Sequence, residues 1–174
     1  MSDERLAAWV DKLEIRELIE TSMRHIDDER GDLFAELFEP DGVMQLSGTV
    51  FAGRDALRGL WEKTDWPHWT EDGQLLLHPL SAHLAHNPVI EVSGDTATAE
   101  TDMTVIMRGD DGKYTVTMSA RYRDRLRRGA DGVWRIRSRT GVSLGRPGQA
   151  HTDVEWARAL AKMPADTRAQ FRFD

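Results

Sequence analysis

Core-facing positions in the first part of the chain recur at helical spacing. They stand three or four residues apart at Ile15, Leu18, Ile19, Ser22, Met23 and Ile26. This spacing predicts an amphipathic helix over about 11–29 that Gly31 ends. A second short helix is expected over 32–39, with Asp32 as its N-cap and with Leu33, Phe34, Leu37 and Phe38 in the core. A third follows Gly53.

From His83 onward the hydrophobic period becomes two, which predicts strands over 83–92, 96–108, 113–128 and 133–143. Two inward faces are expected, made by Ala97, Ala99, Met103, Val105 and Met107 and by Tyr114, Val116, Met118, Ala120 and Tyr122. The alternate positions are polar, which indicates a sheet packed on one face only. Helices followed by a meander of strands indicate an α+β fold rather than a doubly wound parallel one.

We expect one domain over 1–174, with a core at about 10–143 and a helical tail over 152–174. The length of 174 residues is usual for a single domain. Thr152 and Glu155 have the spacing of a capping box, which predicts the start of that last helix. The sequence contains no repeat or linker that would divide it.

Charge and composition exclude several classes of function. A net charge of -7 argues against a nucleic-acid partner, which requires a clustered positive surface. The arginines at 121, 123, 125, 127 and 128 are the exception, and on a strand their alternate members form a solvated or oligomer-facing ladder. The absence of cysteine excludes disulfides, thiolate catalysis and cysteine-ligated metals.

Neither a membrane segment nor a metal site is expected. The first residues lead into a charged helix, and no apolar run has the length of a membrane span, so a cytoplasmic protein is predicted. His83 and His86 stand three residues apart and would point to opposite faces of a regular strand. They could not hold one metal between them.

Several segments together resemble one known superfamily. They are EIRELI at 14–19, HIDD at 25–28, LFEPDG at 37–42, GRDA at 53–56, HLAHNPVI at 83–90, GDTA at 94–97, YRDRL at 122–126 and DGVWRI at 131–136. In this order they resemble the SnoaL-like, or nuclear transport factor 2-like, superfamily, and within it the dehydratase-like branch of scytalone dehydratase and bile acid 7α-dehydratase.

The resemblance implies a cone-shaped α+β barrel, with the N-terminal helices packed on the concave face of a curved, mostly antiparallel sheet. It also implies a small-molecule substrate, no cofactor and a homo-oligomer, either a dimer or a trimer. The superfamily contains dehydratases, polyketide cyclases, isomerases, epoxide hydrolases and binders without activity, so the fold alone does not fix the function.

The dehydratase-like branch carries an aspartate after the first helix and a histidine on the first long strand, which here are Asp27 and His83. Asp27 lies at the edge of the apolar arc of its helix, so it serves either as a helix-end hydrogen-bonding group or as a partner of the histidine. His83 is either structural or the group that moves a proton, because histidine can donate and accept one near neutral pH.

Four further residues are candidates for substrate binding. Trp61 and Trp66 belong to a tryptophan-rich segment that forms either a lid over an apolar substrate or a loop packed by its own aromatics. Tyr122 lies on the inward face and could donate its hydroxyl to a developing oxyanion. Arg139 matches an arginine of the superfamily, but it has the opposite parity to Trp134 and would need a bulge to point inward.

The sequence departs from the dehydratase-like branch at one position. Members of that branch tend to carry a tyrosine near the end of the first helix, and residues 22–26 contain none. The resemblance and the Asp27–His83 pair imply a cofactor-independent lyase that acts by acid–base elimination, and the missing tyrosine weighs against plain dehydration of a scytalone-like substrate and leaves related carbon–carbon cleavage open. Its substrate is expected to be small, hydrophobic and oxygenated, and to be aromatic or polycyclic. The alternatives are a polyketide-type cyclase or isomerase, and a ligand-binding module without activity.

Overall fold

A computed structural model describes residues 3–46, 48–60, 81–108 and 111–144 of the chain. Its helices are α1 (Asp3–Asp27), α2 (Gly31–Glu36) and α3 (Arg54–Gly59). Its strands are β1 (Phe38–Leu46), β2 (Thr49–Ala52), β3 (Ser81–Ser93), β4 (Thr96–Arg108), β5 (Tyr114–Arg128) and β6 (Trp134–Ser143). Within the described ranges no helix is both long and apolar enough to cross a membrane.

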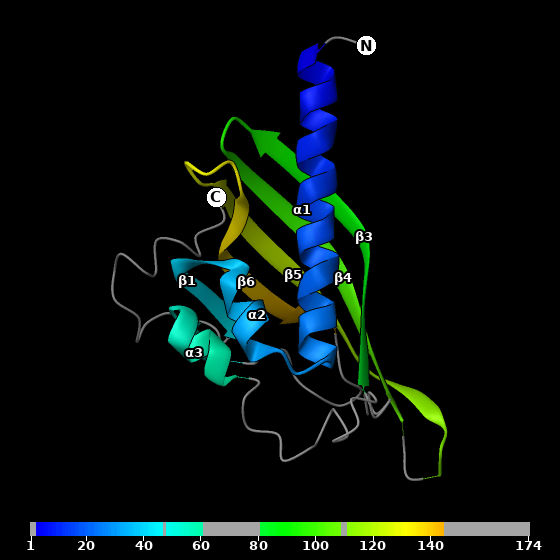
Figure 1. The fold of residues 1–174 in the computed structure, drawn as a ribbon. Helices are drawn as coiled ribbons and strands as arrows, with labels where there is room; N and C mark the ends of the chain where they lie inside the picture. The colour runs from blue at the N-terminus through cyan, green and yellow to red at the C-terminus, as the bar shows by residue number, and fades with distance from the viewer. Residues whose placement is uncertain (1–2, 47, 61–80, 109–110, 145–174) are drawn as a thin grey trace, which may run out of the picture.

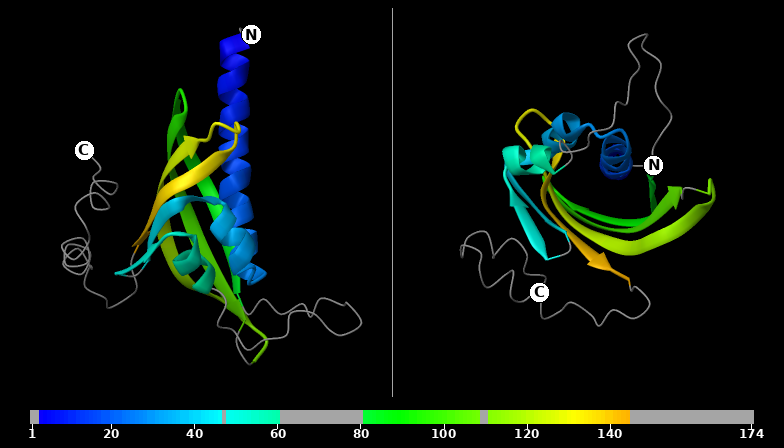
Figure 2. Two further views of the ribbon diagram at one scale, coloured as in Figure 1. Left: turned by 60° about the vertical axis from the view of Figure 1, so that its left-hand side comes forward. Right: turned by 90° about the horizontal axis from the view of Figure 1, so that it is seen from below.

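The strands form one curved, unclosed sheet in the order β2-β1-β6-β5-β4-β3 (Figure 1). Neighbouring strands are antiparallel except β1 and β6, which run parallel. The helices lie on the concave side, where α1 packs mainly along β3 (Figure 2). The expected α+β architecture, with helices against the concave face of a mostly antiparallel sheet, is confirmed.

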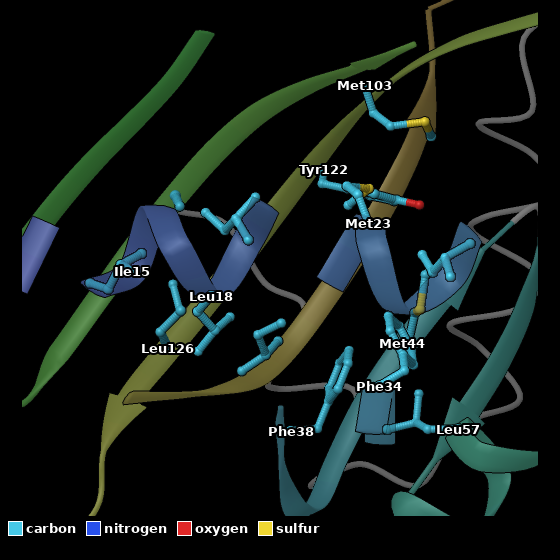
Figure 3. Close-up of a cluster of buried hydrophobic side chains, with 14 of the residues drawn as sticks. Ile15, Leu18, Met23, Phe34, Phe38, Met44, Leu57, Met103, Tyr122 and Leu126 are labelled. Carbon is cyan, nitrogen blue, oxygen red and sulfur yellow. The ribbon is translucent and has the colours of Figure 1, made fainter. Parts of the chain in front are cut away.

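The hydrophobic core lies between α1 and the inward positions of the sheet. Every second residue of β4 is buried from Ala97 to Val105, and α1 contributes Ile15, Ile19, Met23 and Ile26. Figure 3 shows Met23 of α1 in one cluster with Phe34, Phe38 and Met44. The residues that recur at helical spacing in α1 and those that alternate along the strands therefore form one core.

A buried polar contact fixes the first half of α1 to the sheet. Asp11 is only 7% exposed, and it accepts hydrogen bonds from Arg128 Nη1 at 2.6 Å and from Trp134 Nε1 at 3.2 Å. The Arg128 guanidinium also lies 4.9 Å from the centre of the Trp134 ring. Because both charged groups are partnered, the pair does not carry the cost of an isolated buried charge.

The structure corrects the predicted second helix. α2 ends at Glu36 rather than at 39, its N-cap is Arg30 rather than Asp32, and Leu33 is 38% exposed. Phe38 is buried as expected, but it begins β1, a strand that the sequence analysis did not predict. Pro40 and Gly42 look like the end of a helix, yet they lie in an irregular part of β1 between its Phe38 and Val43 pairings. β2 was not predicted either.

The structure also corrects the inward face of β5. Val105 pairs with Met118 while Ile106 pairs with Val116, so Thr117 is an extra residue in the ladder. Such a bulge exchanges the faces of the sheet to which the earlier residues of the strand point. Tyr114 and Val116 are therefore on the opposite side from Met118, and they are 68% and 66% exposed.

Candidate active site

Asp27 and His83 meet at one end of the concave face. Asp27 is the last residue of α1, and His83 is near the start of β3. The Asp27 carboxylate lies 2.7 Å from His83 Nδ1, and it also accepts the backbone N–H of His83, at 3.1 and 3.0 Å to its two oxygens. Their side chains are 11% and 12% exposed, respectively. This pairing is one of the two alternatives that the sequence predicted for Asp27.

This contact determines how the imidazole is held. An ionised carboxylate can only accept hydrogen bonds, so the proton of a neutral His83 ring belongs on Nδ1 and the lone pair on Nε2. The two further hydrogen bonds from the backbone N–H of the same residue fix the carboxylate relative to β3. The arrangement can orient a general base in the manner of a histidine–aspartate pair.

The register of β3 places His83 on the inner face. His83 pairs with Val105, whose side chain is in the core, whereas His86 pairs with Asp102 on the outer face. There His86 Nε2 lies 3.0 Å from Thr104 Oγ1. The two histidines therefore point to opposite sides of the sheet, as the sequence predicted.

Arg139 lies inside the core because β6 contains a bulge. Leu126 pairs with Ile136 while Arg125 pairs with Ser138, so Arg137 is the extra residue. Beyond it the parity reverses, and Arg139 is completely buried. The bulge that the sequence analysis required for an inward Arg139 is present.

The Arg139 guanidinium is held by protein groups. Its Nε and Nη2 each donate to the Asp124 carboxylate at 2.8 Å, in a bidentate pair in which neither side chain is exposed. Its Nη1 donates to Ser22 Oγ on α1, also at 2.8 Å. Asp124 was missed by the sequence analysis, although a carboxylate at an inward position between Tyr122 and Leu126 was the available signal.

Tyr122 lies directly under this ion pair. The Arg139 guanidinium carbon lies 4.8 Å from the centre of the Tyr122 ring, which is a cation–π contact. Burial raises the pKa of the Tyr122 phenol to about 12, so the hydroxyl stays protonated at neutral pH. Gly141 leaves room for the ring, because a Cβ at that position would be only 3.0 Å from Tyr122 Cε1.

The remaining two predicted site residues, Trp61 and Trp66, lie outside the described residues. So does the helix predicted to start at Thr152. Among the described residues, the candidate site therefore consists of the Asp27–His83 pair and of Tyr122 with its Arg139–Asp124–Ser22 support, all on the concave side of the sheet.

The chain is similar in sequence to one protein family and in fold to several solved structures. The sequence model of the SnoaL-like domain matches residues 8–140. An NTF2-like protein with a cystatin-like fold from Novosphingobium aromaticivorans is 26% identical and superimposes with a TM-score of 0.67, covering 98% of this chain and 94% of that chain. A protein of unknown function from Mycobacterium tuberculosis is 27% identical, with a TM-score of 0.68 and coverages of 89% and 87%.

A third similar structure, from Catenulispora acidiphila, was solved in complex with S-DNPA. It is 24% identical and has a TM-score of 0.63, covering 77% of this chain and 93% of that chain. No curated protein matches the sequence.

Proposed function

Since the chain belongs to the SnoaL-like domain family, we propose that it is a cofactor-independent lyase that acts on a small, hydrophobic, oxygenated substrate. The observation that carries the proposal is the 2.7 Å contact between Asp27 and His83 Nδ1. It gives a histidine of defined tautomer on the inner face of a fold whose family includes dehydratases and polyketide cyclases. Asp27 is then a positioning residue and His83 the catalytic one.

The proposed reaction begins with proton abstraction. His83 Nε2 takes a proton from a carbon next to a carbonyl group, and the electron pair of that C–H bond moves into the carbonyl to form an enolate. When the enolate collapses, its carbonyl group re-forms and a double bond forms between the deprotonated carbon and the next carbon along the chain. The C–O bond of that next carbon breaks. The leaving oxygen takes the proton back from His83 and departs as water, so that the histidine returns to its starting state.

Tyr122 is the proposed hydrogen-bond donor to the far end of the substrate. His83 pairs with Val105 and Tyr122 pairs with Thr101, four residues further along β4, which is about 13 Å along a strand. A molecule that contacts both side chains has to be elongated, which favours a substrate of fused or linked rings. In this proposal Arg139 does not contact the substrate but supports the Tyr122 ring.

The same abstraction would also serve a cyclase or an isomerase. The sequence around the end of α1 keeps this alternative open, because residues 22–26 lack the tyrosine expected of the dehydratase-like branch. In a cyclase the enolate carbon would attack a second carbonyl group instead of expelling an oxygen. All three reactions share the first step, so the first step is the one to test.

Solvent deuterium exchange measures that step without knowledge of the natural substrate. The probe is 2-tetralone, a bicyclic ketone with acidic C–H bonds next to its carbonyl group. We expect the protein to accelerate exchange at C1 in D₂O, followed by NMR, and we expect His83→Ala to lower the acceleration ~10²–10⁴-fold. If the probe binds, as seen by NMR line broadening, but its exchange is not accelerated, the chain is a binding module and the proposal is wrong.

A further inference from the structure

The outer, convex face of the sheet carries a groove that the proposed reaction does not use. Its volume is about 670 Å³, and its lining includes Glu91, Thr96, Thr98, Arg125, Arg127 and Arg137. This volume is within the ~300–1,000 Å³ typical of small-molecule sites. We propose that this groove is a second binding site, for a phosphorylated small molecule.

The strand register separates the groove from the candidate active site. Thr98 pairs with Glu91 on one side and with Arg125 on the other, and it alternates with the buried Ala97 and Ala99. These polar side chains therefore point away from α1. Thr98 is also seven residues from Val105, the partner of His83, which is about 24 Å along β4.

The bulge in β6 contributes a third arginine to the groove. Arg125 and Arg127 are two residues apart on β5 and share the outer face, and Ser138 lies opposite Arg125. Arg137 is the extra residue of the bulge, next to Ser138. Its exposed side chain is therefore the third arginine beside Arg125 and Arg127. Bulges are common next to functional sites because they redirect a side chain in this way.

The charges in the groove favour an anionic ligand. Three guanidinium groups line it, in a protein whose net charge is -7. Among the described residues, the carboxylate of Glu91 lines the groove, and Glu39 accepts a hydrogen bond from Arg127 Nε at 2.5 Å. Like charges on neighbouring strands disfavour each other, so an anion bound between the guanidinium groups would stabilise them.

The shape of the donors indicates which anion. The planar fork of arginine matches the oxygens of phosphate and carboxylate in a bidentate way. A phosphate group has enough oxygens to bind more than one guanidinium group, and Thr98 adds a hydroxyl to the lining of the groove. The aliphatic stems of the three arginines and the methyl groups of Thr96 and Thr98 lie on the same face, so an organic group attached to the phosphate has a surface to contact.

Calorimetric titration at low ionic strength tests this site with named probes. They are inorganic phosphate, pyrophosphate, 1-naphthyl phosphate and the uncharged 1-naphthol. We expect 1-naphthyl phosphate to bind with one molecule per chain and more tightly than inorganic phosphate, and we expect 1-naphthol not to compete with it. If pyrophosphate binds more tightly than 1-naphthyl phosphate, the site takes an inorganic anion and the organic part of the proposal is overturned.

Variants locate the binding. Arg137→Gln should weaken 1-naphthyl phosphate at least about tenfold, because it removes a charge-assisted hydrogen bond. Arg24→Gln removes the same charge from an exposed position on α1 and should change affinity less than about twofold, as should His83→Ala. Equal losses in Arg137→Gln and Arg24→Gln would indicate nonspecific attraction and overturn the proposal. The proposal is also overturned if the wild type does not bind 1-naphthyl phosphate at millimolar concentration. It is overturned as well if Arg137→Gln changes the oligomeric mass while the wild type binds no anion.

Discussion

Arg139 and Asp124 form the most deeply buried charged pair among the described residues. Neither side chain is exposed, and each satisfies the other through two hydrogen bonds of 2.8 Å. A buried pair of this kind adds little stability compared with apolar residues, but removal of one partner leaves an unpaired charge in the core. In our proposal the pair acts mainly to position Tyr122 and Ser22, which Arg139 contacts.

This reasoning gives a prediction for stability. Asp124→Leu or Arg139→Met should each lower the free energy of unfolding by about 3–5 kcal/mol, measured by urea denaturation. The double variant should be more stable than either single variant, because no unpaired charge remains.

A matched control is the exposed pair of Arg16 and Glu20, whose side chains are each 53% exposed. Arg16→Met should leave the urea midpoint almost unchanged, because exposed ion pairs contribute little. Single variants of the buried pair that unfold at the wild-type midpoint would contradict the assigned role.

The sequence predicted some of these residues but not their support. Asp27 and His83 were found because a carboxylate at the edge of an apolar arc and a histidine at the start of a strand also matched a family pattern. Arg139 could be placed inside only on the condition of a bulge, since simple alternation assigns it to the outer face. Asp124 has the inward parity of Tyr122 and Leu126, but its partner Arg139 reaches it only because of the bulge in β6, which alternation along the sequence does not show.

Bulges are also the main reason why strand predictions were incomplete at the scale of elements. The long alternating segments gave β3 to β6 nearly to their ends. Extra residues at Thr117 and Arg137, however, reverse the parity in the middle of a strand. β1 and β2 were not recognised because the turn-like Pro40 and Gly42 lie inside an irregular strand, and because burial of the neighbouring segment depends on its parallel pairing with β6.

The bulge of β3 yields a prediction about its backbone. His86 pairs with Asp102 and Val89 with Glu100, so one residue is extra, and Asn87 has a φ of 53°. A β-branched residue is strongly disfavoured in this left-handed region, whereas glycine is not. Asn87→Val should lower the free energy of unfolding by about 1–2 kcal/mol, and Asn87→Gly should change it by less than about 0.5 kcal/mol.

Thermal and urea unfolding of both variants would measure this difference. Equal stability of Asn87→Val and Asn87→Gly would mean that the left-handed conformation at residue 87 is not maintained in solution.

At the scale of the whole molecule, the outer face of the sheet is polar but closely paired. Asp102 and Arg121 are 2.7 Å apart, and Glu100 and Arg123 are 3.1 Å apart. Leu84 lies on the same face, opposite Thr104, and is 46% exposed. This end of the outer face is suited to contact with a second copy, and we predict a homo-oligomer formed through it, beside the groove lined by Thr98, Arg125 and Arg137 and not over it.

Light scattering at micromolar concentration should give at least twice the chain mass of 19.7 kDa. Leu84→Asp should lower the measured mass, because it places a charge in the contact. Leu13→Asp, at a 61% exposed position of α1, should not. A wild-type particle of about 20 kDa would contradict the prediction.

The arrangement of the molecule also explains why Asp27 and His83 are expected to act as one unit. They are 56 residues apart in the chain and meet only because α1 ends beside the start of β3. Residues that act together in one proton transfer lose their effects together when substituted. Because Asp27 also accepts the His83 backbone N–H, the thermal unfolding of every variant has to be compared as a control.

The most direct test is a double-mutant cycle on the rate of 2-tetralone deuterium exchange. It compares the wild type with His83→Ala, Asp27→Asn and the double variant. We predict a large loss in His83→Ala, a smaller one in Asp27→Asn through loss of the oriented tautomer, and no further loss in the double variant beyond His83→Ala alone. Losses that multiply in the double variant, with all four proteins folded, would contradict the proposal that Asp27 positions His83 for proton transfer.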